Sequence, residues 1–237
     1  MTAQETTQIN LPGQTHAAEG PHDQTGMYVM HHAFRRDLTT FEAAVRQTPV
    51  GDHATWQAQQ ARWERFATVL HHHHEVEDVS IWPVLVRHAA RTEDVAAQQT
   101  LQAMEDEHAD IDPALAAVRQ GFAHMVEHPC DDHRNALDVH VTATRAALLD
   151  HLRHEETEAL PYLQKVMTAE EFAASEKAAA AGYPPRLMPF LLPWVADGLP
   201  DEVVQRLIGG AGLAYAVALR LFRRGYHQRE RRAFRYV

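Results

Sequence analysis

The most constraining feature of this sequence is an internal repeat of histidine and glutamate. His73 is followed four residues later by Glu77, and the same spacing returns at His151 and Glu155. In both copies an acid follows the glutamate directly, and a proline stands six residues after it. Residues four apart lie on one face of an α-helix, one above the other. The repeat therefore predicts two helices that each direct an imidazole and a carboxylate at one point.

Each of these pairs is preceded by a lone histidine. His31 stands 42 residues before His73, and His108 stands 43 residues before His151. The chain thus contains two similar helix pairs, whose four imidazoles and two carboxylates can hold two cations and leave positions open for an oxide, a hydroxide or a gas. We predict a two-metal site with these ligands: His31, His73, Glu77, His108, His151 and Glu155.

Apolar residues in the central part of the chain recur at helical spacing, without strand-like alternation. The joints between the expected helices are short and contain proline or glycine, which makes consecutive helices antiparallel neighbours. We therefore predict an all-α protein, an up-down-up-down four-helix bundle with a helical C-terminal appendage. The four helices are expected at residues 27–47, 52–88, 92–126 and 131–166.

The parts on either side of the bundle differ from it in character. The N-terminal residues are polar and show no periodicity, which is typical of disorder. A capping box at Thr168-Ala-Glu-Glu171 begins a C-terminal extension, prolines interrupt it, and a final helix is expected from Pro200 to about Gly225. Its apolar anchors predict that it lies along the bundle or along a second copy. We expect three parts: a disordered N-terminal arm at 1–25, the bundle at 26–167 and a helical C-terminal extension at 168–237.

Histidine is the compositional outlier, with 18 residues among 237, and such chains are candidates for metal binding. The formal net charge of -10 gives no general attraction to nucleic acid or to an anionic membrane. The longest apolar stretch, near residues 207–219, is shorter than the roughly 20 residues of a membrane-spanning helix. A single cysteine, Cys130, excludes an internal disulfide, and no signal-peptide pattern is visible. We expect a cytoplasmic protein with no nucleic-acid partner and no transmembrane segment.

The segments around the expected ligands form four recognisable motifs. They read His31-x-x-Phe-Arg-Arg, His73-x3-Glu77-Asp with Trp82-Pro83, Glu107-His108, and His151-Leu-x-x-Glu155-Glu with Pro161. With them, residues 26–166 resemble the hemerythrin family and its HHE cation-binding signature, in particular the actinobacterial hemerythrin-like proteins. The resemblance implies a bundle with a non-haem di-iron centre, two iron ions joined by an oxide or hydroxide bridge. On ligand type alone, zinc is an alternative.

The chain departs from the family pattern at two positions. Oxygen-carrying members have a second histidine four residues after the third-helix ligand, where this chain has Asp112. They carry a carboxylate five residues after the fourth-helix histidine, which makes Glu156 an alternative ligand to Glu155. The internal repeat favours Glu155, because that residue matches Glu77. Only one or two of four consecutive histidines can face a helix-bundle core, so we expect the neighbours of His73 to be solvated or to support the ligands: His71, His72 and His74.

One imidazole fewer predicts a more open and more oxygen-rich site than that of an oxygen carrier. This favours reaction with O2, peroxide or nitric oxide and motivates the first of three hypotheses on function, of which the third is a partner-binding protein whose bundle is only structural. The first is an enzyme, either a di-iron catalase or peroxidase or an oxygen-activating oxidoreductase, with an electron donor as a further partner. The second is a module that senses or stores oxygen, nitric oxide or iron without turnover. A homodimer through the C-terminal extension is also expected.

Overall fold

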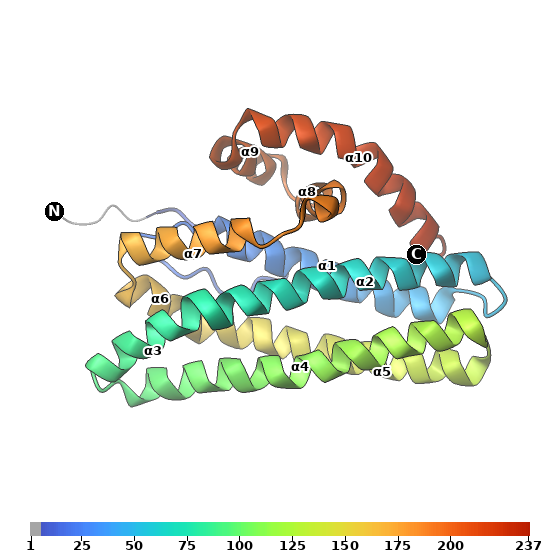
Figure 1. Cartoon of the computed structure of the whole chain (residues 1–237), viewed down its shortest axis with the longest axis horizontal. Helices are drawn as coiled ribbons and strands as arrows, with labels where there is room; N and C mark the ends of the chain where they lie inside the picture. Colours follow the sequence, from blue (N-terminus) through green and yellow to red (C-terminus); the bar gives the residue numbers. More distant parts are fainter. Residues whose placement is uncertain (1–5) are drawn as a thin grey trace.

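The periodic segments of the sequence form helices in the computed structural model, which describes residues 6–237 (Figure 1). No strand occurs in that range. The elements of the bundle are α1 (Thr25–Gln47), α2 (His53–Val76), η1 (Glu77–Ile81), α3 (Trp82–Arg91), α4 (Val95–Glu127), α5 (Asp131–His154), η2 (Glu155–Ala159) and α6 (Leu160–Val166). The elements of the C-terminal extension are α7 (Ala169–Ala181), η3 (Pro185–Leu187), α8 (Met188–Ala196), α9 (Asp201–Ala211) and α10 (Leu213–Ala233).

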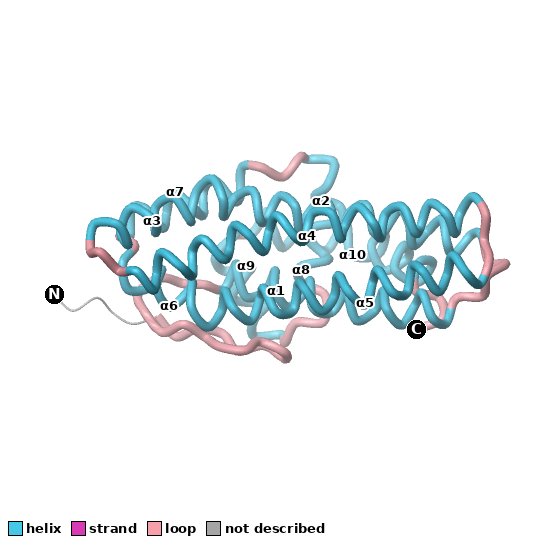
Figure 2. The backbone as a smooth tube through the Cα atoms, turned by 90° about the horizontal axis from the view of Figure 1, so that it is seen from below, coloured by secondary structure: helices cyan, strands magenta, loops and turns pink. Residues whose placement is uncertain are grey.

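The first eight elements form a bundle of four antiparallel arms. The arms are α1, α2 with α3, α4, and α5 with α6, and they lie side by side in both views (Figures 1 and 2). Helix α2 packs between α1 and α4, and α5 packs between α4 and α1, so the arms close a ring around one interior. The predicted all-α bundle with C-terminal helices is confirmed.

Side chains at the helix ends explain where several helices begin. Asp52 caps α2 by accepting a hydrogen bond from the backbone of Thr55, and Asp94 caps α4 in the same way. The capping box predicted at Thr168 and Glu171 is confirmed, with both of its hydrogen bonds formed. These caps satisfy backbone N–H groups that have no partner inside the helix.

Two arms of the bundle are interrupted where the sequence predicts continuous helices. The five-residue elements η1 and η2 are π-helical turns, and they begin at Glu77 and Glu155. Pro83 and Pro161 follow at the start of α3 and α6. Proline lacks the N–H of an α-helical hydrogen bond, and its ring presses on the preceding turn, so a wider turn before it relieves the conflict. The repeat in the sequence therefore produces the same local distortion twice, at both expected carboxylate ligands.

The interior holds two apolar clusters separated by a belt of polar residues. One cluster is built around Phe34, Phe66 and Phe122 toward the end of the bundle at the α4–α5 joint. The other surrounds Trp82 and Leu160 near α3 and α6. The residues predicted as ligands occupy the belt between them, because in each arm they fall between members of the two clusters in the sequence.

The N-terminal segment differs from the disordered arm that the sequence predicts. Residues 6–24 lie on the bundle, with Ile9, Leu11 and Ala18 buried. The Gln164 side chain of α6 donates hydrogen bonds to the carbonyls of Ala18 and His22. The bundle thus supplies partners for an irregular backbone, and this long-range pairing leaves no periodic signal in the sequence. The remaining part of the expected arm, residues 1–5, lies outside the described residues.

The C-terminal extension is attached to the bundle through buried charged groups. Arg62 of α2 forms ion pairs with Asp37 of α1 and Glu230 of α10, and Trp194 of α8 donates a hydrogen bond to Asp37 over 2.7 Å. The predicted final helix is divided into α9 and α10 at Gly212, whose φ of 81° favours glycine. Across the described residues, no helix has both the length and the hydropathy of a membrane span.

Candidate metal centre

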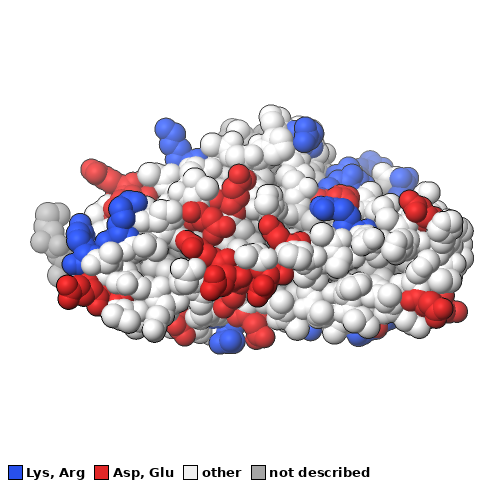
Figure 3. Space-filling view, turned by 60° about the horizontal axis from the view of Figure 1, so that its bottom comes forward, with Lys and Arg blue, Asp and Glu red and all other residues white. Residues whose placement is uncertain are grey.

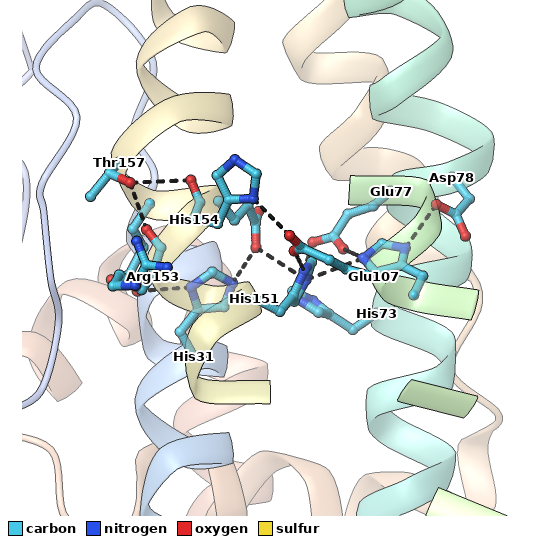
Figure 4. A network of polar contacts seen from close by, with 12 residues as sticks. His31, His73, Glu77, Asp78, Glu107, His151, Arg153, His154 and Thr157 are labelled. Carbon is cyan, nitrogen blue, oxygen red and sulfur yellow. Dashed lines mark hydrogen bonds and ion pairs between the residues drawn. The ribbon is translucent and has the colours of Figure 1, made fainter. Parts of the chain in front are cut away.

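The structure brings residues from three arms together in a first ligand group. His31 of α1, His73 and Glu77 of the second arm, and Glu155 at the start of η2 each offer an atom within 4.8 Å of the others. His31 Nε2 lies 3.1 Å from Glu155 Oε2, and His73 Nε2 lies 3.0 Å from Glu77 Oε1. All four side chains are buried, and the labelled members converge in the interior (Figure 4).

A second ligand group shares one carboxylate with the first. It consists of His74, Glu77, His108 and His151, again with atoms within 4.8 Å of one another. The Nε2 atoms of His108 and His151 are 3.2 Å apart, and His108 Nε2 is 3.5 Å from Glu77 Oε2. Because Glu77 belongs to both groups, its two oxygens are placed to bridge two cations. All six residues predicted as ligands therefore lie in one centre.

His74 is the member of the centre that is not among the ligands predicted from the sequence. Its ring is buried and stacks on His108 with centroids 3.9 Å apart. Within residues 6–237 neither of its nitrogens has a hydrogen-bond partner. The run of four histidines indicates that some face the core, but one residue of helix turns a side chain by only 100°, so adjacent His73 and His74 can both face a wide interior.

The count of imidazoles changes with His74. The structure supplies five, with His74 on α2 in addition to the four predicted ones. The expected deficit, inferred from Asp112 in place of a third-helix histidine, is therefore made up from the second arm. Asp112 itself is exposed and lies 3.5 Å from the exposed His71. The prediction of a more open site than that of an oxygen carrier rested on this deficit and loses its basis.

Glu156, the alternative ligand, supports a histidine and belongs to neither ligand group. Its Oε1 accepts a hydrogen bond from His31 Nδ1 at 2.9 Å and from Arg35 at 2.7 Å. Its Oε2 accepts a hydrogen bond from the backbone N–H of Thr15 at 2.7 Å. This carboxylate fixes the tautomer and orientation of the imidazole, leaving Nε2 to face the centre.

Two other carboxylates hold histidines of the second group. Asp78 accepts a hydrogen bond from His108 Nδ1 at 2.8 Å, and Glu107 accepts one from His151 Nδ1 at 2.8 Å and one from His154 (Figure 4). Asp78 follows Glu77 in the chain as Glu156 follows Glu155, so the repeat extends to the supporting acids. Each acid of this repeat holds the lone histidine of the other helix pair.

Burial and mutual repulsion make the metal-free centre electrostatically unfavourable. Burial, and next the charge of the neighbouring histidines, holds the pKa of His73 and of His74 well below the usual range of histidine. Burial, and next the charge of Glu155, raises the pKa of Glu77 well above its usual value. A bound cation would supply the positive charge that the carboxylates lack and would accept the lone pairs of the neutral imidazoles.

His31 and its acidic neighbours form an ion cluster when no cation is bound. Burial alone would lower the pKa of His31, but Glu155 and Glu156 outweigh it and raise that pKa to about 9. Burial opposes ionisation of Glu156, but the hydrogen bonds from His31 and Arg35 prevail and lower its pKa to about 2. The pKa of Glu155 is lowered as well, because the charge of His31 outweighs the effect of burial.

The unpaired polar atoms of the interior fit a metal pair. Buried donors and acceptors without partners are costly, and native proteins rarely keep them. In this centre the unpaired nitrogen and oxygen atoms point at one another without forming hydrogen bonds, even where His73 Nε2 lies only 3.0 Å from Glu77 Oε1. Ligands around a common ion are arranged in this way. Within the described chain the unpaired atoms of the centre are Nε2 of His31, Nε2 of His73, both nitrogens of His74, and both carboxylate oxygens of Glu77 and of Glu155.

The surface over this centre carries negative charge. Exposed acids flank His108 on α4, and Figure 3 shows acidic side chains gathered in the middle of the face on which α4 lies. Such a surface attracts cations over a distance of about one Debye length. The exposed acids of this part of α4 are Glu105, Asp106, Asp110 and Asp112.

An antiparallel helical bundle with buried imidazoles and carboxylates facing one another defines a class of metal-binding bundle proteins. Within that class the chain belongs to the hemerythrin family. The family model described as "Hemerythrin HHE cation binding domain" matches residues 23–163, which include every residue of both ligand groups. No curated protein and no solved structure matches the chain significantly. Membership of this family implies a cation-binding function.

Proposed function

We propose that this protein is a non-haem di-iron protein that binds or reacts with O2, peroxide or nitric oxide. The observation that carries the proposal is the pair of buried four-residue groups that share Glu77. Five imidazoles and two carboxylates form a mixed nitrogen and oxygen donor set, which suits iron, while zinc is the alternative to be tested.

The side chains of the centre have separate tasks in this proposal. When bound, the iron pair supplies redox chemistry and coordination positions for a small oxidant or gas. Glu77 and Glu155 balance the charge of the cations. Asp78, Glu107 and Glu156 hold the imidazoles, and the two apolar clusters exclude water from both sides of the polar belt.

The test is metal analysis of the purified protein combined with an absorption spectrum. We expect two irons per chain and charge-transfer bands that change on addition of peroxide or nitric oxide. Oxygen evolution from peroxide then separates turnover from binding. A protein that takes up zinc in preference to iron, or that binds no metal after anaerobic reconstitution with Fe²⁺, would contradict the proposal.

A sensing or storage function is the second candidate, and one contact favours it. His72, next to the ligand His73, meets Tyr183 of the extension edge-on, with ring centroids 4.2 Å apart. A change at the centre therefore has a short path to the C-terminal helices. Under this alternative, nitric oxide or oxygen changes the protease sensitivity of residues 182–237 without any turnover of peroxide.

The expected location and assembly are part of the proposal. A single free cysteine, Cys130, suits the reducing cytoplasm. A homodimer through α10 is supported by an exposed apolar stripe, since Leu213, Val217 and Leu221 are 79%, 52% and 70% exposed and lie four residues apart. Light scattering of the protein, compared with a variant in which all three are replaced by glutamine, tests the dimer.

A further inference from the structure

A large cavity lies between the bundle and the C-terminal extension. Its volume is about 790 Å³, and its walls come from α1, α2, η1 and α6–α10. Cavities of this size hold organic molecules with many non-hydrogen atoms, whereas a water molecule takes up only about 30 Å³ in the liquid. A diatomic gas would leave almost all of this space empty. The walls are mainly apolar and include Met27, Met30, Leu191, Leu192, Val195 and Leu207.

The cavity reaches the metal centre at its inner end. His73 and Glu77, both members of the first ligand group, form part of its wall, together with the neighbouring Val76 and Ile81. Tyr183 also lines it, and the charge of Glu77 acts on this phenol. An occupant of the cavity would therefore contact the edge of the centre directly.

We propose that this cavity binds an uncharged, apolar organic molecule with one end against His73 and Glu77, as the organic substrate or effector of the metal centre. The role of this ligand as substrate or effector rests on the proposed function of the metal centre. Its binding to the cavity does not require the metal. The extension supplies much of the wall, so it is part of the ligand site and more than a cover for the bundle.

The charges around the cavity decide the class of ligand. Arg206 in the wall is already paired with Asp23 at 2.8 Å, so its charge is compensated within the protein. Apart from Glu77, the other charged residues of the wall are Glu176 and Lys177, which have opposite signs and are exposed to solvent.

At the inner end, the side chains next to His73 and Glu77 in the wall are the apolar Val76 and Ile81, which give a charged group of a ligand no partner. Tyr183 keeps its proton, because burial, and then the charge of Glu77, raises its pKa well above the usual value. The hydroxyl thus offers a neutral ligand a hydrogen bond in an otherwise apolar space.

Two adjacent glycines of α9 provide a matched test of binding. Gly210 lines the cavity and Gly209 does not, and a Cβ atom on either would meet nothing within 4 Å. The first side-chain atom of a tryptophan therefore has free space at both positions, but only Gly210→Trp adds its indole at the cavity wall. Both variants replace glycine in an exposed helical segment, so their effects on helix stability are alike.

The first measurement uses metal-free protein and the uncharged fluorescent probe N-phenyl-1-naphthylamine. We expect saturable binding to the unmodified protein and to Gly209→Trp, and binding weaker by about tenfold or more for Gly210→Trp, with equal circular dichroism and thermal melting for the two variants. No saturable binding to the unmodified protein, or equal affinity for the two variants, would overturn the proposal.

The second measurement tests how close the probe lies to the centre. The protein is loaded with paramagnetic Co²⁺ or with diamagnetic Zn²⁺, and the proton resonances of the bound probe are recorded. We expect broadening with Co²⁺ only, and sharp resonances in both samples would overturn the placement at the inner end. A protein that binds the probe but takes up no metal would instead contradict the proposed function and leave the cavity site intact.

Discussion

Glu156 accepts a hydrogen bond from His31 over 2.9 Å, although the two residues are 125 positions apart in the chain. The bond uses Nδ1 of the imidazole, so the second nitrogen faces the metal centre. This relationship assigns different tasks to two consecutive glutamates. Glu155 belongs to a ligand group, and Glu156 orients a ligand from outside it.

We expect Glu156→Gln to keep two metal ions but to bind them about 10–100-fold more weakly, because the amide no longer fixes the His31 tautomer through a charged acceptor. Glu155→Gln should lose metal outright, since it removes a charged ligand. Competition with a chromophoric chelator measures both affinities. The assignment is wrong if Glu156→Gln is the variant that loses metal and Glu155→Gln retains it.

The run of four histidines offers a comparison between neighbours on one helix. His74→Ala should lower the metal content from two ions toward one, as should His73→Ala, because each belongs to a ligand group. His71→Ala should leave it at two, since the His71 side chain is 64% exposed. Elemental analysis after reconstitution with Fe²⁺ measures the metal content of each of the three variants. Full metal content in His74→Ala would show that this imidazole only packs on His108.

The raised pKa of His31 predicts how the stability of the metal-free protein depends on pH. A group whose pKa rises from 6.5 in the unfolded chain to about 9 on folding stabilises the protein fully below about 6.5. That stabilisation is lost as the pH rises through about 9. The contribution of His31 to the free energy of unfolding is therefore at most about 3 kcal/mol.

We therefore expect the free energy of unfolding of the metal-free protein, measured in urea, to fall between pH 7 and pH 9.5. His31→Gln should remove most of this slope, because it leaves no proton to lose at this position. A slope that is unchanged in His31→Gln would mean that another group is responsible. Because a bound cation requires the neutral imidazole, the metal-loaded protein should not show the same loss.

The attachment of the extension predicts a large difference between two arginines. Arg62→Ala should destabilise the protein by about 3–5 kcal/mol, because it leaves Asp37 and Glu230 without their buried partner. Arg119 pairs with Glu64 at the surface, where both side chains are nearly half exposed. Arg119→Ala should cost only about 0–1 kcal/mol. Urea denaturation of both variants makes the comparison, and equal losses would contradict the buried network.

The bundle and six of the seven residues that the structure gathers in the centre could be predicted from the amino-acid sequence alone. Helical periodicity is a local property, so it marks the buried face of each arm. The His-x3-Glu repeat places two ligands on one such face. Because the repeat occurs in both helix pairs, it indicates that the two pairs contribute ligands to one centre. The π turns at Glu77 and Glu155 are the local consequence of the prolines that follow them.

The different roles of residues that are neighbours in the chain depend on how the helices pack and could not be predicted from the sequence. His73 and His74 differ by one position, as do Glu155 and Glu156, and their roles depend on how the helices are rotated against one another. The N-terminal segment and the cavity depend on contacts between residues more than 100 positions apart, such as Gln164 with Ala18. Hydrophobic periodicity describes one helix at a time, whereas the N-terminal segment and the cavity are formed by the surfaces of several helices. These two features are therefore determined by how the helices pack against one another.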